Sequence, residues 1–248
     1  EMKKAAHLTG QDLMNMVQLR PQDIGKYAIV PGPKERLDSL MKKIENPVKN
    51  FSFMEYTMYT GQYAGTRVTA INGGRFSADT GITTEILCSA KAQYMIRIGS
   101  CGALTPDIKI GDLIIVESAL RGEGVTPYYV KNDFKTQADV GLTKNLEEVA
   151  KDSGLTIHRG RVWSTDAILR ETPEYVGNAV KDGCIAVDMV SSTFLTIAQV
   201  YNIKAVAILA VSDNIATGQM GFMDPGYYMA ESAITTIALN LVKKLEGK

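Results

Sequence analysis

Tyr94-Met-Ile-Arg-Ile-Gly-Ser-Cys-Gly-Ala-Leu104 is an apolar run that contains one arginine and leads into two glycines around a Ser-Cys pair. This pattern predicts a buried strand that ends in a glycine turn. Arg97 inside such a strand needs an anionic partner, because burying an unpaired charge is costly. The glycines would let backbone N–H groups and the Ser100 hydroxyl approach a small anion. The stretch therefore fits a phosphate site, and it fits equally well an arginine paired with a carboxylate beside an ordinary turn.

Length and charge limit the classes of protein that this chain can represent. Its 248 residues, 45% of them hydrophobic, are enough for one large core, and we predict a single domain over residues 1–248. Basic and acidic residues number 27 each, so no net charge attracts nucleic acid or an anionic membrane. No apolar run approaches the roughly 18 residues of a membrane span, and the start lacks the apolar core of a signal peptide. We expect a cytoplasmic protein without nucleic-acid or membrane partners.

The cysteines and histidines predict neither disulfides nor a metal site. Cys88, Cys101 and Cys184 contain no closely spaced pair, and His7 and His158 are the only histidines. The usual zinc-ligand spacings are therefore missing.

Strand-like and helix-like segments alternate along the whole chain. We predict strands at 27–30, 56–63, 66–72, 94–98, 113–116, 156–163, 184–188 and 205–211. We predict helices at 11–19, 37–44, 79–91, 143–153, 173–182, 191–201 and 228–246. The seven consecutive apolar residues at 205–211 indicate a strand covered on both faces. This alternation predicts an α/β fold, a three-layer α/β/α sandwich around a mixed central sheet.

Ligands of such sheets gather at the carboxyl ends of strands. Gly32, Ser100, Asp188 and Asp213 are each expected just past a strand end. The turn that precedes Arg36 enters a helix, and a helix N-terminus is a natural anion site. Arg36 either completes that site or stays on the surface of the first helical turn.

Four motifs together resemble the nucleoside phosphorylase family, which includes purine nucleoside, uridine and methylthioadenosine phosphorylases. The resemblance runs nearly end to end. It is carried by the segments Val30-Pro-Gly-Pro-Lys-Glu-Arg36, Ile96-Arg-Ile-Gly-Ser-Cys-Gly-Ala103, Ala186-Val-Asp-Met-Val-Ser-Ser192 and Val211-Ser-Asp-Asn214. It favours the anion-binding interpretation of Arg97 over the internal ion pair.

The resemblance also implies roles for individual residues. Phosphate contacts are implied for Gly32, Arg36, Arg97, Ser100 and, from a neighbouring subunit, Lys49; sugar contacts for Asp188, Met189 and a neighbour's His7; base contacts for Cys101, Gly102, Ile168, Val187 and Asp213. The contacts of Lys49 and His7 require a homo-oligomer, either a dimer or a trimer of dimers.

The implied reaction is phosphorolysis of a nucleoside, with inorganic phosphate as co-substrate and without a cofactor. Catalysis would rest on positioning and on electrostatic stabilisation, with Arg97 at the phosphate. Asp213, kept protonated, would donate to N7 of a departing purine. The alternative structural role for Asp213 is to cap the following turn.

Two departures from the family pattern leave the substrate open. Val190 stands where the family has a glutamate that binds the ribose hydroxyls, and losing such an acceptor costs about 1.5–3 kcal/mol. The protein then takes an altered sugar, or it is an impaired or non-catalytic nucleoside-binding member. Thr172 and Glu174 replace the Gln and Arg that read uracil, and with Asp213 they favour purines. The run at 191–196 and the His7 arm nevertheless resemble the uridine branch.

A nucleoside hydrolase is disfavoured, because related nucleosidases do not keep the pair of arginines. The whole hypothesis requires that Arg36 and Arg97 lie together. It also requires that internal acids do not already neutralise both of them.

Overall fold

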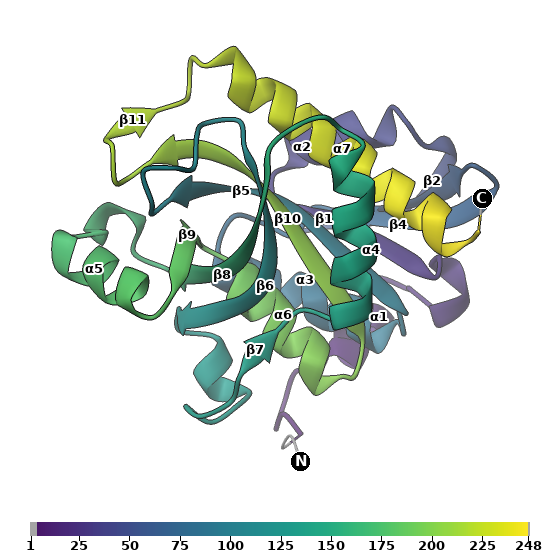
Figure 1. The fold of residues 1–248 in the computed structure, drawn as a ribbon. Helices are drawn as coiled ribbons and strands as arrows, with labels where there is room; N and C mark the ends of the chain where they lie inside the picture. Colours follow the sequence, from purple (N-terminus) through teal and green to yellow (C-terminus); the bar gives the residue numbers. More distant parts are fainter. Residues whose placement is uncertain (1–3, 248) are drawn as a thin grey trace.

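A computed structural model describes residues 4–247, and these residues form one eleven-stranded mixed sheet with helices on both faces (Figure 1). The strands are β1 (Tyr27–Pro31), β2 (Glu45–Phe53), β3 (Tyr56–Tyr63), β4 (Thr66–Ile71), β5 (Tyr94–Ala103), β6 (Leu113–Gly122), β7 (Thr136–Gln137), β8 (Ile157–Thr165), β9 (Cys184–Asp188), β10 (Lys204–Asn214) and β11 (Gln219–Met220). The α-helices are α1 (Gly10–Met16), α2 (Lys34–Met41), α3 (Ser77–Ser89), α4 (Val140–Lys151), α5 (Pro173–Lys181), α6 (Ser191–Val200) and α7 (Pro225–Leu245). The short 3-10 helices are η1 (Pro21–Asp23), η2 (Thr126–Tyr128) and η3 (Ile168–Arg170).

Part of the sheet closes on itself. Along the sheet the strands follow the order β11-β10-β6-β8-β9-β5-β1-β4-β3-β2, with β7 beside β6. β10 also pairs with β5 in parallel, so β5, β10, β6, β8 and β9 form a closed ring. Strand twist makes such closure feasible. The alternation of elements in the sequence does not reveal it, because alternation says nothing about which strands meet across the fold.

Two groups of helices cover the two faces of the sheet. Figure 1 shows α2, α4 and α7 over one face, and α1, α3 and α6 over the other. Each group packs on its own buried apolar cluster. All residues from Ala205 to Val211 are buried, which confirms that this segment of β10 is covered on both sides.

The predicted strands at 94–98, 113–116 and 205–211 are shorter than the observed β5, β6 and β10. β5 does not end in a glycine turn at Gly99, because it continues to Ala103 with β10 along one side and β9 joining at its end. Ser100 and Asp213 therefore lie within strands, whereas Gly32 follows β1 and Asp188 ends β9. β2 was not predicted at all, since its residues are mostly exposed and lack an apolar alternation. Cross-strand hydrogen bonding outweighs the weak local propensity of these segments.

None of the helices within residues 4–247 is long and apolar enough to span a bilayer. The cysteines at positions 88, 101 and 184 are buried and free, so the described chain contains no disulfide. No group of three or more His, Cys, Asp or Glu side chains in the described part of the chain is arranged to hold a metal ion.

Candidate active site at the carboxyl ends of the strands

Two glycine loops meet beside the first strand of the site. Gly32 follows β1, and Gly73 and Gly74 follow β4. The Gly73 N–H donates to the Pro31 carbonyl at 2.6 Å, and the Gly74 N–H donates to the Gly32 carbonyl at 3.0 Å. Glycine keeps both loops close to Arg97, because an added Cβ on Gly32 would lie 3.1 Å from Arg97 Nη2, and one on Gly73 would lie 2.6 Å from Val30 Cγ1 and 3.0 Å from Arg97 Nη1.

Arg36 and Arg97 converge on these glycines. The same Cβ position on Gly32 lies 3.6 Å from Arg36 Nη1, so both guanidinium groups face one small volume. We call Gly32, Gly73, Arg36 and Arg97 the arginine seat. The requirement that Arg36 and Arg97 lie together is met.

Arg97 is buried with only 4% of its surface exposed, and its Nε and Nη1 atoms have no hydrogen-bond partner among the described residues. The pKa of its guanidinium is lowered from 12.5 to about 10, mainly by burial; the Asp188 charge opposes this shift and the Arg36 charge adds to it. The group still carries its proton at neutral pH. A buried cation with free N–H groups is the arrangement expected of an anion site.

Arg36 differs, because an internal acid already contacts it. Its Nη2 donates to Glu231 Oε2 at 3.0 Å, and its Nη1 donates to the Ile98 carbonyl at 3.4 Å. Tyr227 Oη also donates to Glu231 Oε2, at 2.8 Å, and the Ser100 hydroxyl hydrogen-bonds Tyr227. Only one of the two arginines is therefore neutralised, and the predicted residue Ser100 is linked to the seat through Tyr227 and Glu231.

Three strands bring the predicted base-contacting residues together. Gly102 on β5 pairs with Val187 on β9 and with Asp213 on β10. The β5–β10 register shifts between Val211 and Asp213, which marks a bulge at Ser212. The bulge places Asp213 over Gly102, where an added Cβ would lie 3.1 Å from Asp213 Oδ2. Cys101, Gly102, Val187 and Asp213 are thus neighbours, as the resemblance implies.

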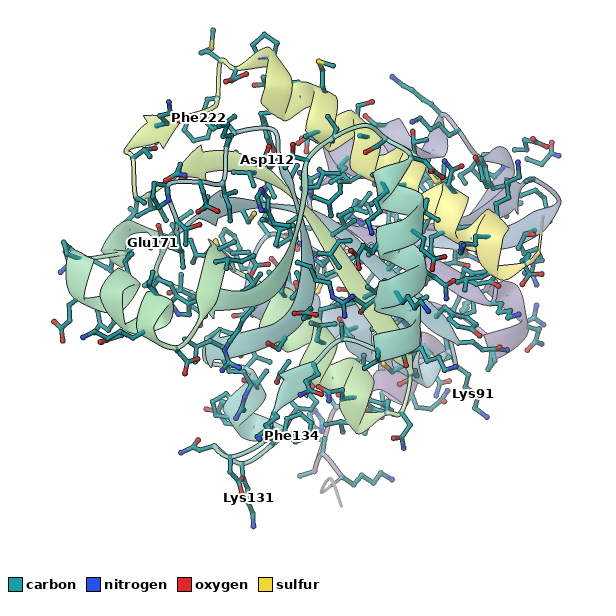
Figure 2. The ribbon with its side chains drawn as sticks, viewed as in Figure 1. Lys91, Asp112, Lys131, Phe134, Glu171 and Phe222 are labelled. Carbon is teal, nitrogen blue, oxygen red and sulfur yellow. The ribbon has the colours of Figure 1, made fainter. Side chains whose placement is uncertain are left out.

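Asp213 faces a second carboxyl group, that of Glu171. Figure 2 shows Glu171 on the inner side of α5, below the β10–β11 hairpin. Burial raises the pKa of Asp213, and a hydrogen bond from Ser212 Oγ at 2.8 Å only partly opposes this shift. Burial and the Asp213 charge raise the pKa of Glu171 from 4.5 to about 7. Glu171 therefore keeps its proton up to a pH of about 7, and the burial of Asp213 favours the protonated form of that carboxyl as well.

Among the residues predicted to contact the sugar, Asp188 already makes hydrogen bonds within the protein. Asp188 accepts hydrogen bonds from Ser164 Oγ and Ser191 Oγ, each at 2.6 Å, and from the Ser191 N–H at 3.0 Å. Met189 is half-buried beside it. Val190 is 3% exposed and precedes the first residue of α6, so it packs in the interior.

Three other predicted residues stand apart from this group. Lys49 is exposed on β2, which lies three strands away from β1, or about 14 Å at the usual strand spacing. It does not reach the arginine seat of its own chain. His7 is exposed before α1, and Ile168 is 55% exposed in η3. Their contacts with a neighbour or a base stay predictions.

Residues 26–242 match the family model described as phosphorylase superfamily. The chain belongs to the phosphorylase superfamily. This confirms the family predicted from the four motifs.

The related proteins and similar solved structures are phosphorylases named for different nucleosides. The chain is 35% identical over 206 residues to a purine nucleoside phosphorylase DeoD-type of Colwellia psychrerythraea, covering 82% of this chain and 88% of the relative. It is 30% identical over 226 residues to a uridine phosphorylase of Thermococcus kodakarensis, covering 86% and 82% of the two chains. The purine nucleoside phosphorylase of Toxoplasma gondii in complex with immucillin-H shares the fold, with a TM-score of 0.84 at 23% identity over 92% of this chain and 94% of that one.

Four residues of this superfamily member escaped the sequence-based prediction. Gly73 had a usable signal, since a glycine pair directly after a strand marks a carboxyl-end loop. Tyr227 and Glu231 lie on α7, far along the chain from Arg36, and nothing in their spacing indicates the contact. Glu171 lies between η3 and α5, where no periodicity identifies inward-facing side chains.

Proposed function

We propose that this protein cleaves the N-glycosidic bond of a nucleoside with inorganic phosphate, giving a free base and a sugar 1-phosphate. The observation that carries the proposal is Arg97, a buried guanidinium with unpartnered N–H groups that faces Gly32 together with Arg36. The names of the relatives support the same reaction class, since they include purine nucleoside, uridine and guanosine phosphorylases.

The arginine seat holds the phosphate in this proposal. Arg97 binds it with its free N–H groups, and the backbone at Gly32 approaches without steric hindrance. Phosphate then attacks the anomeric carbon as the bond to the base breaks, and the transition state resembles a ribosyl oxocarbenium ion. Phosphate itself is the nucleophile, so the protein's part is to position phosphate and nucleoside and to stabilise the transition state with fixed charges.

Asp213 acts on the leaving base. Burial raises the pKa of Asp213, which favours the protonated carboxyl that could donate as electron density builds up on the base. N7 of a purine is the acceptor that this role requires, so we favour purine nucleosides, with uridine as the alternative. The second carboxyl of the pair, Glu171, adds to this preference, because an acidic pocket suits a base that accepts a proton.

The sugar side carries no acidic replacement for the family's glutamate at position 190. Asp188 is held by hydrogen bonds from Ser164 and Ser191, and its charge acts on Arg97. No relative or structural observation supports the alternative of an impaired or non-catalytic member. We propose that the active form is a cytoplasmic homo-oligomer that uses small-molecule substrates and no cofactor.

The test is base release from inosine, adenosine and uridine, each with and without phosphate. Phosphate-dependent release of base, with sugar 1-phosphate detected by phosphorus NMR, is the expected result. Release that does not depend on phosphate would indicate a hydrolase. Nucleoside binding without release of any base would indicate a binding protein.

A further inference from the structure

Arg36 occupies a place where its surroundings disfavour a cation. It belongs to the first turn of α2, and the N-terminus of a helix carries a partial positive charge. The guanidinium of Arg97 is also close, since an added Cβ on Gly32 would lie 3.1 Å from Arg97 Nη2 and 3.6 Å from Arg36 Nη1. The two like charges repel each other. Both effects favour a conformation in which the Arg36 side chain turns away from Gly32.

One strong contact holds Arg36 in place against these effects. Its Nη2 donates to Glu231 Oε2 at 3.0 Å, whereas its Nη1 donates to the Ile98 carbonyl at 3.4 Å, beyond the usual N–H···O distance of about 3.2 Å or less. Its Nε has no hydrogen-bond partner within residues 4–247. The guanidinium is a rigid plane, so a bond at Nη2 also fixes the direction of Nη1. Glu231 therefore determines that Nη1 faces Gly32.

Glu231 is itself fixed by a neighbour on the same helix. Tyr227 lies one turn before it on α7, and Tyr227 Oη donates to Glu231 Oε2 at 2.8 Å. The Tyr227 side chain is buried, and it also hydrogen-bonds Ser100 on β5. The carboxylate thus has a defined position from which to orient Arg36.

We propose that Glu231 is a positioning residue of the arginine seat, which keeps the Arg36 guanidinium facing Gly32 so that it binds phosphate together with Arg97. The inference rests on the proposed function, in which this seat holds the phosphate co-substrate. Glu231 acts through Arg36, so the proposal requires no contact between Glu231 and phosphate.

A positioning role and a simple charge effect change phosphate affinity in opposite directions. A carboxylate near an anion site repels the anion, so removal of its charge alone should strengthen phosphate binding. Removal of the group that orients Arg36 should weaken binding instead, because the free side chain has to be ordered again when phosphate binds. The direction of the change therefore separates the two roles of Glu231.

Titration calorimetry of inorganic phosphate near neutral pH, without nucleoside, measures this direction. Glu231→Gln keeps the side-chain length and a neutral acceptor, and we expect it to bind phosphate about 3- to 10-fold more weakly than the wild-type protein. Glu231→Ala keeps neither, and we expect a loss of about 10- to 100-fold.

Glu35→Gln is the matched control, because it removes a negative charge from the residue next to Arg36. The Glu35 side chain is exposed and pairs with Arg75 at 3.7 Å, so it does not hold the Arg36 guanidinium. Phosphate affinity in this variant should stay within about twofold of the wild-type value, since an exposed charge is well screened.

A double-mutant cycle tests whether Glu231 acts through Arg36. In the Arg36→Met background, Glu231→Gln is expected to cause no further loss of phosphate affinity. In steady-state assays, Glu231→Gln alone should raise KM for phosphate and leave KM for the nucleoside within about twofold, which a general loss of structure would not do. Thermal unfolding establishes that each variant is folded.

Unchanged or tighter phosphate binding by folded Glu231→Gln overturns the proposal, and so does an equal loss of affinity with and without Arg36. If the wild-type protein releases base in a phosphate-dependent way while Glu231→Gln binds phosphate normally, this inference fails and the proposed function stands. If Glu231→Gln weakens phosphate binding only when Arg36 is present but no base is released by the wild-type protein, the proposed function fails and this inference holds.

Discussion

Beyond β1 and β4, two guanidinium groups face glycines, whereas at the ends of β5, β9 and β10 two carboxyl groups face each other without a cation. The arginine seat is suited to bind an anion, and the carboxyl pair is suited to keep a proton. We therefore expect the arginine seat to bind phosphate and the carboxyl pair to bind a proton. The contrast teaches that charge in this site is arranged for two different tasks, and the following substitutions separate them.

The largest effect is expected for Arg97→Met. It removes at least two charge-assisted hydrogen bonds of about 1.5–3 kcal/mol each, so phosphate affinity should fall by at least about 100-fold. The free energy of unfolding should change little, because the gain from removing a buried charge is opposed by the loss of Arg97's attraction for the buried Asp188 carboxylate. Titration calorimetry and denaturant unfolding measure the two effects. Arg67→Met, an exposed arginine on β4, is the matched control, and unchanged phosphate affinity in Arg97→Met would contradict the assignment.

A smaller effect, confined to the base side, is expected for Asp213→Asn. Loss of the proton donor should lower kcat for inosine by about 10²- to 10⁴-fold. Phosphate affinity should stay within about twofold, because the arginine seat is built from other strands. Asp152→Asn, at an exposed aspartate, serves as the control. Full activity of Asp213→Asn on inosine would show that the base leaves without help from this residue.

Glu171→Gln should change how kcat/KM depends on pH. In the wild-type protein the carboxyl pair keeps a proton until the pH passes about 7, the raised pKa of Glu171. Without Glu171, Asp213 alone holds the proton and should lose it earlier, so the alkaline fall of kcat/KM should move to lower pH.

The same substitution should alter how stability depends on pH. The folded wild-type protein binds the Glu171 proton more tightly than the unfolded chain does, so this contribution to stability is complete below 4.5 and is lost as the pH rises to about 7. It amounts to at most about 3.5 kcal/mol, since the pKa rises from 4.5 to about 7 and one pKa unit corresponds to about 1.4 kcal/mol. Unfolding measured between pH 4.5 and 8 should therefore show a flatter profile for Glu171→Gln. Glu174→Gln, at an exposed neighbour, should leave both profiles unchanged.

The smallest effect is expected for Lys49→Ala. Lys49 is exposed and lies far from the arginine seat of its own chain, so any contact with phosphate has to come from an oligomer. We expect KM for phosphate to rise about three- to tenfold, since a single lysine adds a point charge to a site that already holds two arginines. Lys42→Ala is the control. An unchanged KM would remove Lys49 from the predicted phosphate contacts.

Much of this organisation was predictable because it is local in the sequence. The apolar run at 205–211 indicated its covered strand, and the glycine-rich stretch after Arg97 indicated the site. The extent of β5 was not predictable, because its last residues are held by β9, more than eighty residues later in the chain. The same reason hid Glu231: it contacts Arg36, almost two hundred residues earlier in the chain, and no periodicity within α7 carries that information.

The closed ring of β5, β10, β6, β8 and β9 has a consequence for how this site can change. A strand within a ring has no free edge along which its register slips, so a displacement of Gly102, Val187 or Asp213 has to be accommodated by all five strands. Segments outside the ring, such as η3 and the connection from β10 to α7, are free of that constraint. Divergence in the preferred base should therefore arise through insertions and substitutions in these connections, while the strands preserve the chemistry.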